Sequence, residues 1–405
     1  MYLVFVGKFA VTKLGLSAPP LINYFLMLTS LLAMIKYIPK YGTFLCKYIA
    51  VLVFYLLFKT LFYGLDFLSS VVTYSSFLWC FFFCVIILEL TRNNRINVNK
   101  LKTHFYIIFL LECVLGIAQY LVPSIYEYFH IPTWSWNGTT IEEYVEQNML
   151  VAKAAPIIGS FFQPQTFANL IAIFVMIGCC DLFYFPQQHI KIKLPIIITG
   201  FALCFLTGVR APFLMLVVAL SYLIYKVKRS WMIYYVGAIV AITIFFLGFA
   251  LTDDTGSMAR MQLGLEALFS GDIDLLSTQT IFYSFYMVPY FLHDPLFGVS
   301  LGEKYVLGYY NMKDFSSTDV QLMYILCEIG IVGLIIFIWP VIKFGKIAKC
   351  SSSFNNAKPI LLMCFLLSIV DDTFLVFDAK VLYALSMAFF YSVNFTSMNS
   401  SKSRI

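Results

Sequence analysis

The stretch CFLTGVRAPFLMLVVAL, residues 204–220, joins two apolar segments with hardly a loop between them. Arg210 stands at the join, and its guanidinium is permanently charged and carries five N–H donors. An apolar run of about 20 residues is long enough to cross a bilayer as a helix. The stretch therefore predicts two consecutive membrane spans, and it raises the question of what an arginine does where they meet.

Composition extends this prediction to the whole chain. Hydrophobic residues make up 61% of the 405 residues and charged residues 12%, against about 45–50% and about 25% in soluble proteins. We expect an all-α, polytopic integral membrane protein of about 11–12 transmembrane helices, forming a single transmembrane domain over residues 1–405. Residues 1–16 are apolar but short, so they are either a partial span or an interfacial segment. The predicted spans are 21–38, 44–63, 67–90, 105–122, 166–185, 194–208, 211–226, 231–251, 320–342, 359–376 and 379–396.

Lysine and arginine set the orientation of these spans. Most of the 27 basic residues fall on one side if the spans alternate, including the clusters TRNNRINVNKLK (91–102) and KVKR (226–229). Loops rich in basic residues stay in the cytoplasm, so the long loops 123–165 and 252–319 are expected to face outward. The basic clusters are explained as topology determinants, and no nucleic-acid partner is expected. The expected location is the inner (cytoplasmic) membrane.

The first outward loop ends in a polar motif, GSFFQPQTFAN (159–169), that leads directly into a span. The amides of Gln163, Gln165 and Asn169 are candidates to hydrogen-bond a hydroxyl-rich ligand there. The second outward loop is too long to be a simple connector and is expected to be functional. A loop over the outer mouth of a helix bundle suits a chamber in which a lipid-borne substrate meets polar groups.

Two outward arginines are candidates to bind anions. Arg210 lies between two spans and Arg260 lies in the second loop. A guanidinium fork matches phosphate or carboxylate bidentately, and an ionisable group within the membrane is a functional hypothesis by default. The alternative is a structural ion pair with an acidic residue, for instance Asp371 or Asp372. These two carboxylates could also bind a metal.

Asp319 precedes a predicted span, where it has two possible roles. Aspartate is favoured as a helix N-cap, and it can also act as a general base toward a hydroxyl group. The residues by themselves leave both roles open.

Several of these segments occur in the order typical of one family. The chain resembles the superfamily of O-antigen polymerases (Wzy-type) and O-antigen ligases, through GSFFQPQTFANL, LTGVRAPFL, Arg260, DPLFGVSLG (294–302) and STDVQLMYILCEIGIVGL (317–334). The resemblance implies transfer of a glycan from a polyprenyl-diphosphate carrier at the outer face of the membrane. It implies that Arg210 and Arg260 hold diphosphates and that neither a metal nor another cofactor is needed.

One departure from the family favours the polymerase over the ligase. Ligases typically carry a histidine before the span that contains the Glu-x-Gly stretch, and this chain has Asp319 in SSTDVQLMY. We therefore expect catalysis by Arg210, Arg260 and Asp319, with Gln163, Gln165, Asn169, Asp371 and Asp372 binding substrate. The expected partners are the lipid-linked glycan, membrane lipids and, from the family, a chain-length regulator and a flippase. A ligase and a membrane lipid or solute transporter are the alternatives.

Overall fold

The fold consists of helices throughout the part of the chain that the structure describes. The computed structural model describes residues 18–65, 67–122, 125, 157, 159–160, 164–185, 190–207, 210–237, 240, 288, 291–299, 321–370 and 377–391. The helices are α2 (Ala18–Ile35), α3 (Ile38–Tyr63), α4 (Phe67–Arg92), α5 (Val98–Leu121), α9 (Pro164–Tyr184), α10 (Ile190–Leu206), α11 (Arg210–Lys228), η3 (Arg229–Trp231), α17 (Gln321–Ile347), α18 (Ser351–Val370) and α19 (Phe377–Phe389).

The predicted spans coincide with these helices. Every predicted span from 21–38 to 211–226 overlaps a helix, as does each of the last three. The span predicted at 231–251 is described as far as 237 and at 240, and the loops predicted at 123–165 and 252–319 lie mostly outside the described residues. Five helices in the described part are long and apolar enough to cross a membrane. The chain is an all-α polytopic membrane protein, as predicted.

The helices alternate in direction, so that one set of helix ends meets at an inner end of the bundle. Arg92, the last residue of α4, donates to the backbone oxygens of Ala348 and Lys349 after α17. The hydroxyl of Tyr184, the last residue of α9, donates to the oxygen of Asn356 in α18 at 3.2 Å. We call this the inner end and the opposite one, where α9 and α11 begin, the outer end.

Two buried carboxylates hold basic residues together at the inner end. Asp181 of α9 accepts from Lys102 of α5 at 2.7 Å and from Lys193 of α10 at 2.6 Å, so one carboxylate ties three helices together. Glu89 of α4 accepts from Lys40 at 2.6 Å and Arg92 at 2.7 Å. The predicted basic clusters therefore meet at one end of the bundle, as alternating spans require.

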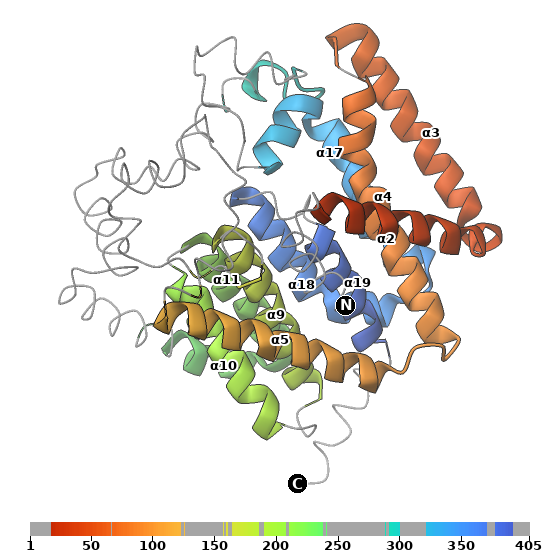
Figure 1. The fold of residues 1–405 in the computed structure, drawn as a ribbon. Coiled ribbons are helices and arrows are strands. Elements are labelled where there is room, and N and C mark those ends of the chain that lie inside the picture. The colour runs from red at the N-terminus through yellow and green to blue at the C-terminus, as the bar shows by residue number, and fades with distance from the viewer. Residues whose placement is uncertain are drawn as a thin grey trace, which may run out of the picture.

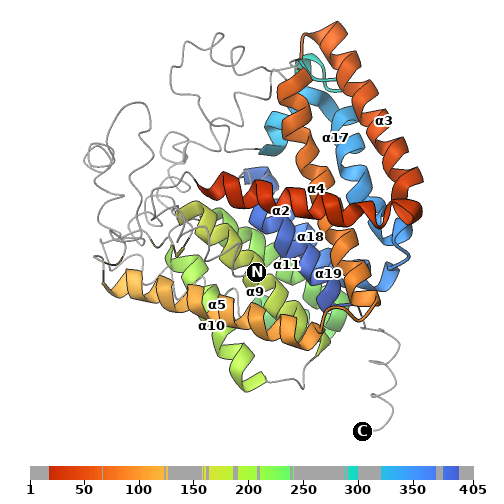
Figure 2. The same ribbon diagram turned by 45° about the vertical axis from the view of Figure 1, so that its right-hand side comes forward.

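Helix α9 lies at the centre of the larger group of helices. In its most apolar stretch, 78% of the residues are buried, and it packs against α10, α11, α18 and α19. Figures 1 and 2 show α3, α4 and α17 side by side in a second group, with α2 crossing α4 steeply. Helices α18 and α19 connect the groups, because α18 also packs on α17 and α19 on α4.

Helix α17 differs from the continuous span predicted at 320–342. Gly330 has φ 65° and ψ −176°, so the chain forms two helices that meet at this residue. Glycine adopts positive φ without the steric cost that a Cβ imposes. Hydropathy could not reveal the break, because apolar residues continue on both sides of it.

Candidate functional site

The outer end of the bundle gathers the helix ends that flank most of the candidate residues. Helices α9, α11 and α17 begin there, and α10 and α18 end there, because their other ends meet at the inner end. Residues Gln165 and Arg210 lie in the first turns of α9 and α11. Asp319 precedes α17 by two residues, and Asp371 directly follows α18 in the sequence.

The entrance to α9 is held in place by two polar side chains of α5. The amide of Gln119 accepts from the backbone N–H of Gly159 at 2.8 Å and donates to the oxygen of the same residue at 3.0 Å. About two turns deeper, the Glu112 carboxylate accepts from the Ser160 N–H at 3.1 Å and from the Ser160 hydroxyl at 2.5 Å. Four hydrogen bonds therefore fix two consecutive residues of the GSFFQPQ motif. We call this arrangement, in which Glu112 and Gln119 hold Gly159 and Ser160, the clamp.

Close packing around this clamp leaves no room for a Cβ at Gly159 and little at Gly116. Gly159 has φ 53°, and a Cβ there would lie 2.3 Å from the ring of Phe167. On α5, a Cβ at Gly116 would lie 3.2 Å from each of Ile157, Leu203 and Phe167. The segment before α9, the first turn of α9 and the end of α10 therefore converge on one spot of α5.

The end of α10 is bound to the start of α9 on the way to Arg210. Cys204 contacts the backbone oxygen of Ala168 at 3.9 Å, and the hydroxyl of Thr207 bonds back to the oxygen of Cys204 at 2.9 Å. Asn169, the neighbour of Ala168, is 4% exposed. The structure thus places Asn169 and the outer end of α10 next to each other.

The remaining candidates are placed less fully. Arg210 is the first residue of α11 and Gln165 the second of α9, and their side chains are not described. Gln163, Arg260, Asp319, Asp371 and Asp372 lie outside the described residues. Their roles stay predictions. The described residues contain no cluster of three histidine, cysteine or carboxylate side chains suited to a metal ion.

The DPLFGV segment (Asp294–Val299) of the second loop is docked in the break of α17. The N–H groups of Ile331 and Val332 donate to the oxygens of Pro295 and Leu296, both at 3.0 Å. In return, the N–H of Val299 donates to the oxygen of Cys327 at 2.7 Å. Backbone groups freed by a break within a membrane need such partners, because lipid offers none.

Helix α3 secures the docked segment through a buried lysine and a tyrosine. Lys59 is fully buried and donates to the oxygen of Gly298 at 2.6 Å, and its charge interacts with Asp294 and with the buried Glu328. The hydroxyl of Tyr55 donates to the oxygen of Ile329, beside the break. Two motifs that the sequence placed apart, DPLFGV and EIGIVGL, are therefore parts of one assembly.

The sequence by itself does not reveal what these buried charged residues do. Glu112 and Lys59 stand out as ionisable groups in apolar spans, but their partners are separated from them by 48 and 239 positions. The sequence contains one signal of a shared partner. Glu112 and Gln119 are seven residues apart, so they lie on the same face of the helix and can contact the same neighbouring segment.

Replacing Glu112 by alanine is expected to lower the free energy of unfolding by about 2 kcal/mol, because the buried N–H and hydroxyl of Ser160 lose their acceptor. Glu112→Gln should cost less than half of that, since its amide oxygen can accept from the N–H and its NH₂ can donate to the hydroxyl. Thermal unfolding in detergent measures both. Equal losses in the two variants would contradict the clamp.

A comparison with known protein families finds a match to the part of the chain that contains several candidate residues. Residues 195–338 match the family model described as O-antigen ligase. The resemblance to the O-antigen polymerase and ligase superfamily is confirmed. The matched segment runs from α10 to the second half of α17 and contains Arg210, Arg260 and Asp319. No curated protein and no solved structure matches the chain.

Proposed function

We propose that this protein is a polymerase that joins oligosaccharide repeat units carried on polyprenyl diphosphate at the outer face of the membrane. The observation that carries the proposal is the position of Arg210. It begins α11 at the outer end of the bundle, within the segment that matches the O-antigen ligase family. The product is a surface polysaccharide such as O-antigen, capsule or exopolysaccharide.

In the proposed reaction the acceptor hydroxyl attacks the anomeric carbon of the donor glycan. A glycosidic bond forms, the bond between that carbon and the phosphate oxygen breaks, and the electron pair leaves with the diphosphate. Arg210 and Arg260 stabilise the negative charge of the diphosphates, since a preorganised guanidinium is most effective where charge develops. Asp319 takes the proton of the acceptor hydroxyl.

The remaining candidates are assigned to substrate binding. The amides of Gln163, Gln165 and Asn169 bind sugar hydroxyls at the entrance to α9, and Asp371 and Asp372 contribute from the end of α18. The clamp on Ser160 supports the assignment of the amides, because it holds the backbone just before α9 in place. Rigid support of this kind keeps reacting groups in position. The proposed reaction requires no cofactor or metal.

The buried charges give the transporter alternative no support. Transport pathways place ionisable groups along the spans, facing a water-filled route. Here Lys59, Glu112 and Asp181 are each engaged in contacts that join elements of the fold. Asp319, in place of the ligase histidine, favours polymerase over ligase.

The test uses the full-length protein, purified and reconstituted in lipid, with a polyprenyl-diphosphate-linked repeat unit as its substrate. A ladder of longer lipid-linked glycans is the expected product. Transfer that occurs only after lipid A–core is added would identify a ligase instead. The absence of any new glycosidic bond from folded protein, under both conditions, would overturn glycosyl transfer.

A further inference from the structure

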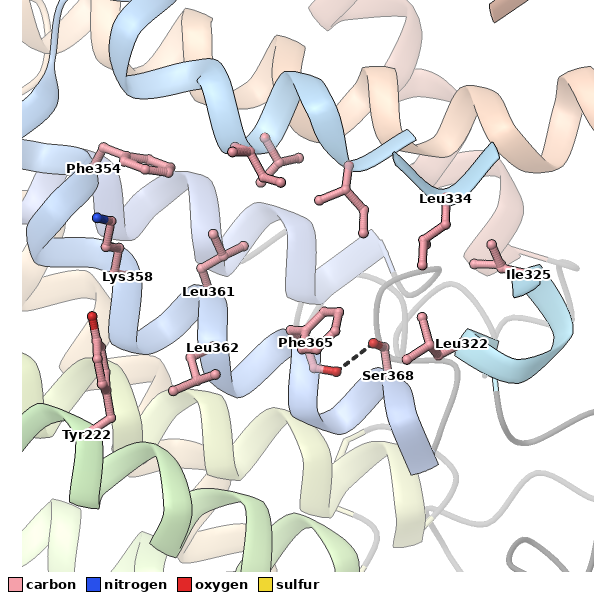
Figure 3. Close-up of a pocket in the computed structure, with 13 residues that line it drawn as sticks. Tyr222, Leu322, Ile325, Leu334, Phe354, Lys358, Leu361, Leu362, Phe365 and Ser368 are labelled. Carbon is pink, nitrogen blue, oxygen red and sulfur yellow. Dashed lines mark hydrogen bonds between the residues drawn. The ribbon is translucent and has the colours of Figure 1, made fainter. Parts of the chain in front are cut away.

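An apolar cavity of about 820 Å³ lies between α11, α17 and α18. Its lining is hydrophobic apart from three side chains, those of Tyr222, Lys358 and Ser368. Figure 3 shows Lys358 between Tyr222 and Phe354 at one end, and Ser368 near Leu322 at the other. The hydroxyl of Ser368 is bonded to the oxygen of Phe365 at 2.6 Å, so the body of the cavity offers a ligand little besides apolar contact.

The cavity has the dimensions and the opening of a site for a lipid chain. Lys358 and Ser368 are ten residues apart on α18, which corresponds to about 15 Å along a helix. This is half of the hydrocarbon core of about 30 Å. Ile342 and Phe365 on its wall are 57% and 36% exposed, so among the described residues the cavity is open at its side.

The end of the cavity near Lys358 is positively charged. Lys226 of α11 lies close enough to Lys358 for their charges to repel each other, and its ammonium group donates to the oxygen of Asn355 in the first turns of α18. The two described carboxylates of the inner end, Glu89 and Asp181, bind other basic residues. Within the described part of the chain, Lys358 forms no ion pair.

We propose that this cavity binds an anionic phospholipid of the cytoplasmic leaflet, with an acyl chain between α17 and α18 and its phosphate at Lys358 and Lys226. The basic inner end is the cytoplasmic one by the distribution of lysine and arginine. Basic pockets between transmembrane helices on that side suit anionic headgroups. The proposal is independent of the glycan reaction, because the charged end lies opposite to Arg210.

The charge at the inner end also distinguishes this lipid from the glycan carrier. A polyprenyl-diphosphate substrate that reacts at Arg210 has its diphosphate at the outer end of the bundle. A lipid anchored at Lys358 has its phosphate at the other surface, and its chain reaches the middle of the membrane. One groove cannot hold both ligands in these positions.

The experiment is native mass spectrometry of the full-length protein in detergent, titrated with phosphatidylglycerol or with phosphatidylcholine of the same acyl chains. We expect one tightly held phosphatidylglycerol. Lys358→Gln should weaken it about fivefold, because a lysine near the membrane surface contributes about that factor. Lys358→Arg should retain it. Leu361→Trp, which fills the cavity, should weaken both lipids.

Lys36→Gln is the matched control, because Lys36 is exposed in the turn between α2 and α3 and lies outside the cavity lining. Equal weakening by Lys36→Gln and Lys358→Gln would mean that charge acts without a site and would overturn the proposal. Equal binding of the two lipids by wild type would overturn it as well. So would displacement of phosphatidylglycerol by an equimolar polyprenyl phosphate, which would assign the groove to the glycan carrier. Each variant is first checked for a monodisperse, folded state.

Discussion

Arg210→Ala is expected to lower the rate of glycan transfer by about a thousandfold. The proposed leaving group is a diphosphate, and an arginine that neutralises charge on a transferring phosphate group contributes a factor of this size or more. Arg210→Lys should recover a small part of the rate, because an ammonium cannot form the bidentate pair that a guanidinium forms. The rate is measured as lengthening of a lipid-linked repeat unit by protein reconstituted in vesicles.

Arg229→Ala is the matched control for this variant. Arg229 follows α11 at its other end, so the substitution removes the same charge from the opposite surface of the bundle. It should leave the transfer rate within about twofold of wild type, as expected of a surface substitution away from the site. A transfer rate for folded Arg210→Ala within tenfold of wild type would rule out the role proposed for Arg210.

Gly330→Ala is expected to lower the free energy of unfolding by about 4 kcal/mol or more and to abolish docking of the DPLFGV segment. A Cβ at this position would lie 2.3 Å from the oxygen of Leu296 and 2.5 Å from its carbonyl carbon. Both atoms are backbone and cannot rotate away, and overpacking and strain at a positive φ are among the few defects that cause losses of this size. Thermal unfolding in detergent measures the loss, and proteolysis near Val299 reports release of the segment.

Gly64→Ala separates the two causes of that loss, which are the left-handed backbone conformation and the steric clash of the Cβ. Gly64 has φ 69°, nearly the same as the 65° of Gly330, but a Cβ there meets nothing within 4 Å. It should therefore cost only the penalty for a left-handed residue, about 1–2 kcal/mol. If Gly330→Ala proved no more destabilising than Gly64→Ala, the close contact with the docked segment would be wrong.

The positions of the helices could be predicted well because the bilayer sets their length and polarity. Their ends could not. The span predicted at 105–122 belongs to a helix that begins at Val98, where the side chain of Asn97 caps it by accepting from the N–H of Lys100. Hydropathy marks where a helix is apolar, whereas backbone hydrogen bonds and caps decide where it begins.

The candidate site was predicted unevenly for a related reason. Chemical type and position relative to a span selected Arg210, Gln165 and Asn169. The structure places all three in the outer halves of their helices, and their roles stay predictions. The clamp of Glu112 on Ser160 was beyond prediction, because it joins residues 48 positions apart. Hydrogen bonds of this kind depend on which helices become neighbours.

The sequence by itself determined that this chain is an all-α membrane protein, that its basic residues gather at one end of the bundle and that it belongs beside the O-antigen polymerases and ligases in motif order. Composition, periodicity and the positions of lysine and arginine suffice for the first two conclusions, because water, lipid and loop charge act on each span separately. The resemblance rests instead on the order of the motifs, and the family match covers residues 195–338. Only the tertiary structure decided that α17 is broken at Gly330, that the DPLFGV segment fills the break and that Lys59 and Glu112 hold loop backbone in place. These features arise where distant segments meet in a medium without water, in which each freed N–H, carbonyl oxygen and charge must find its partner within the protein.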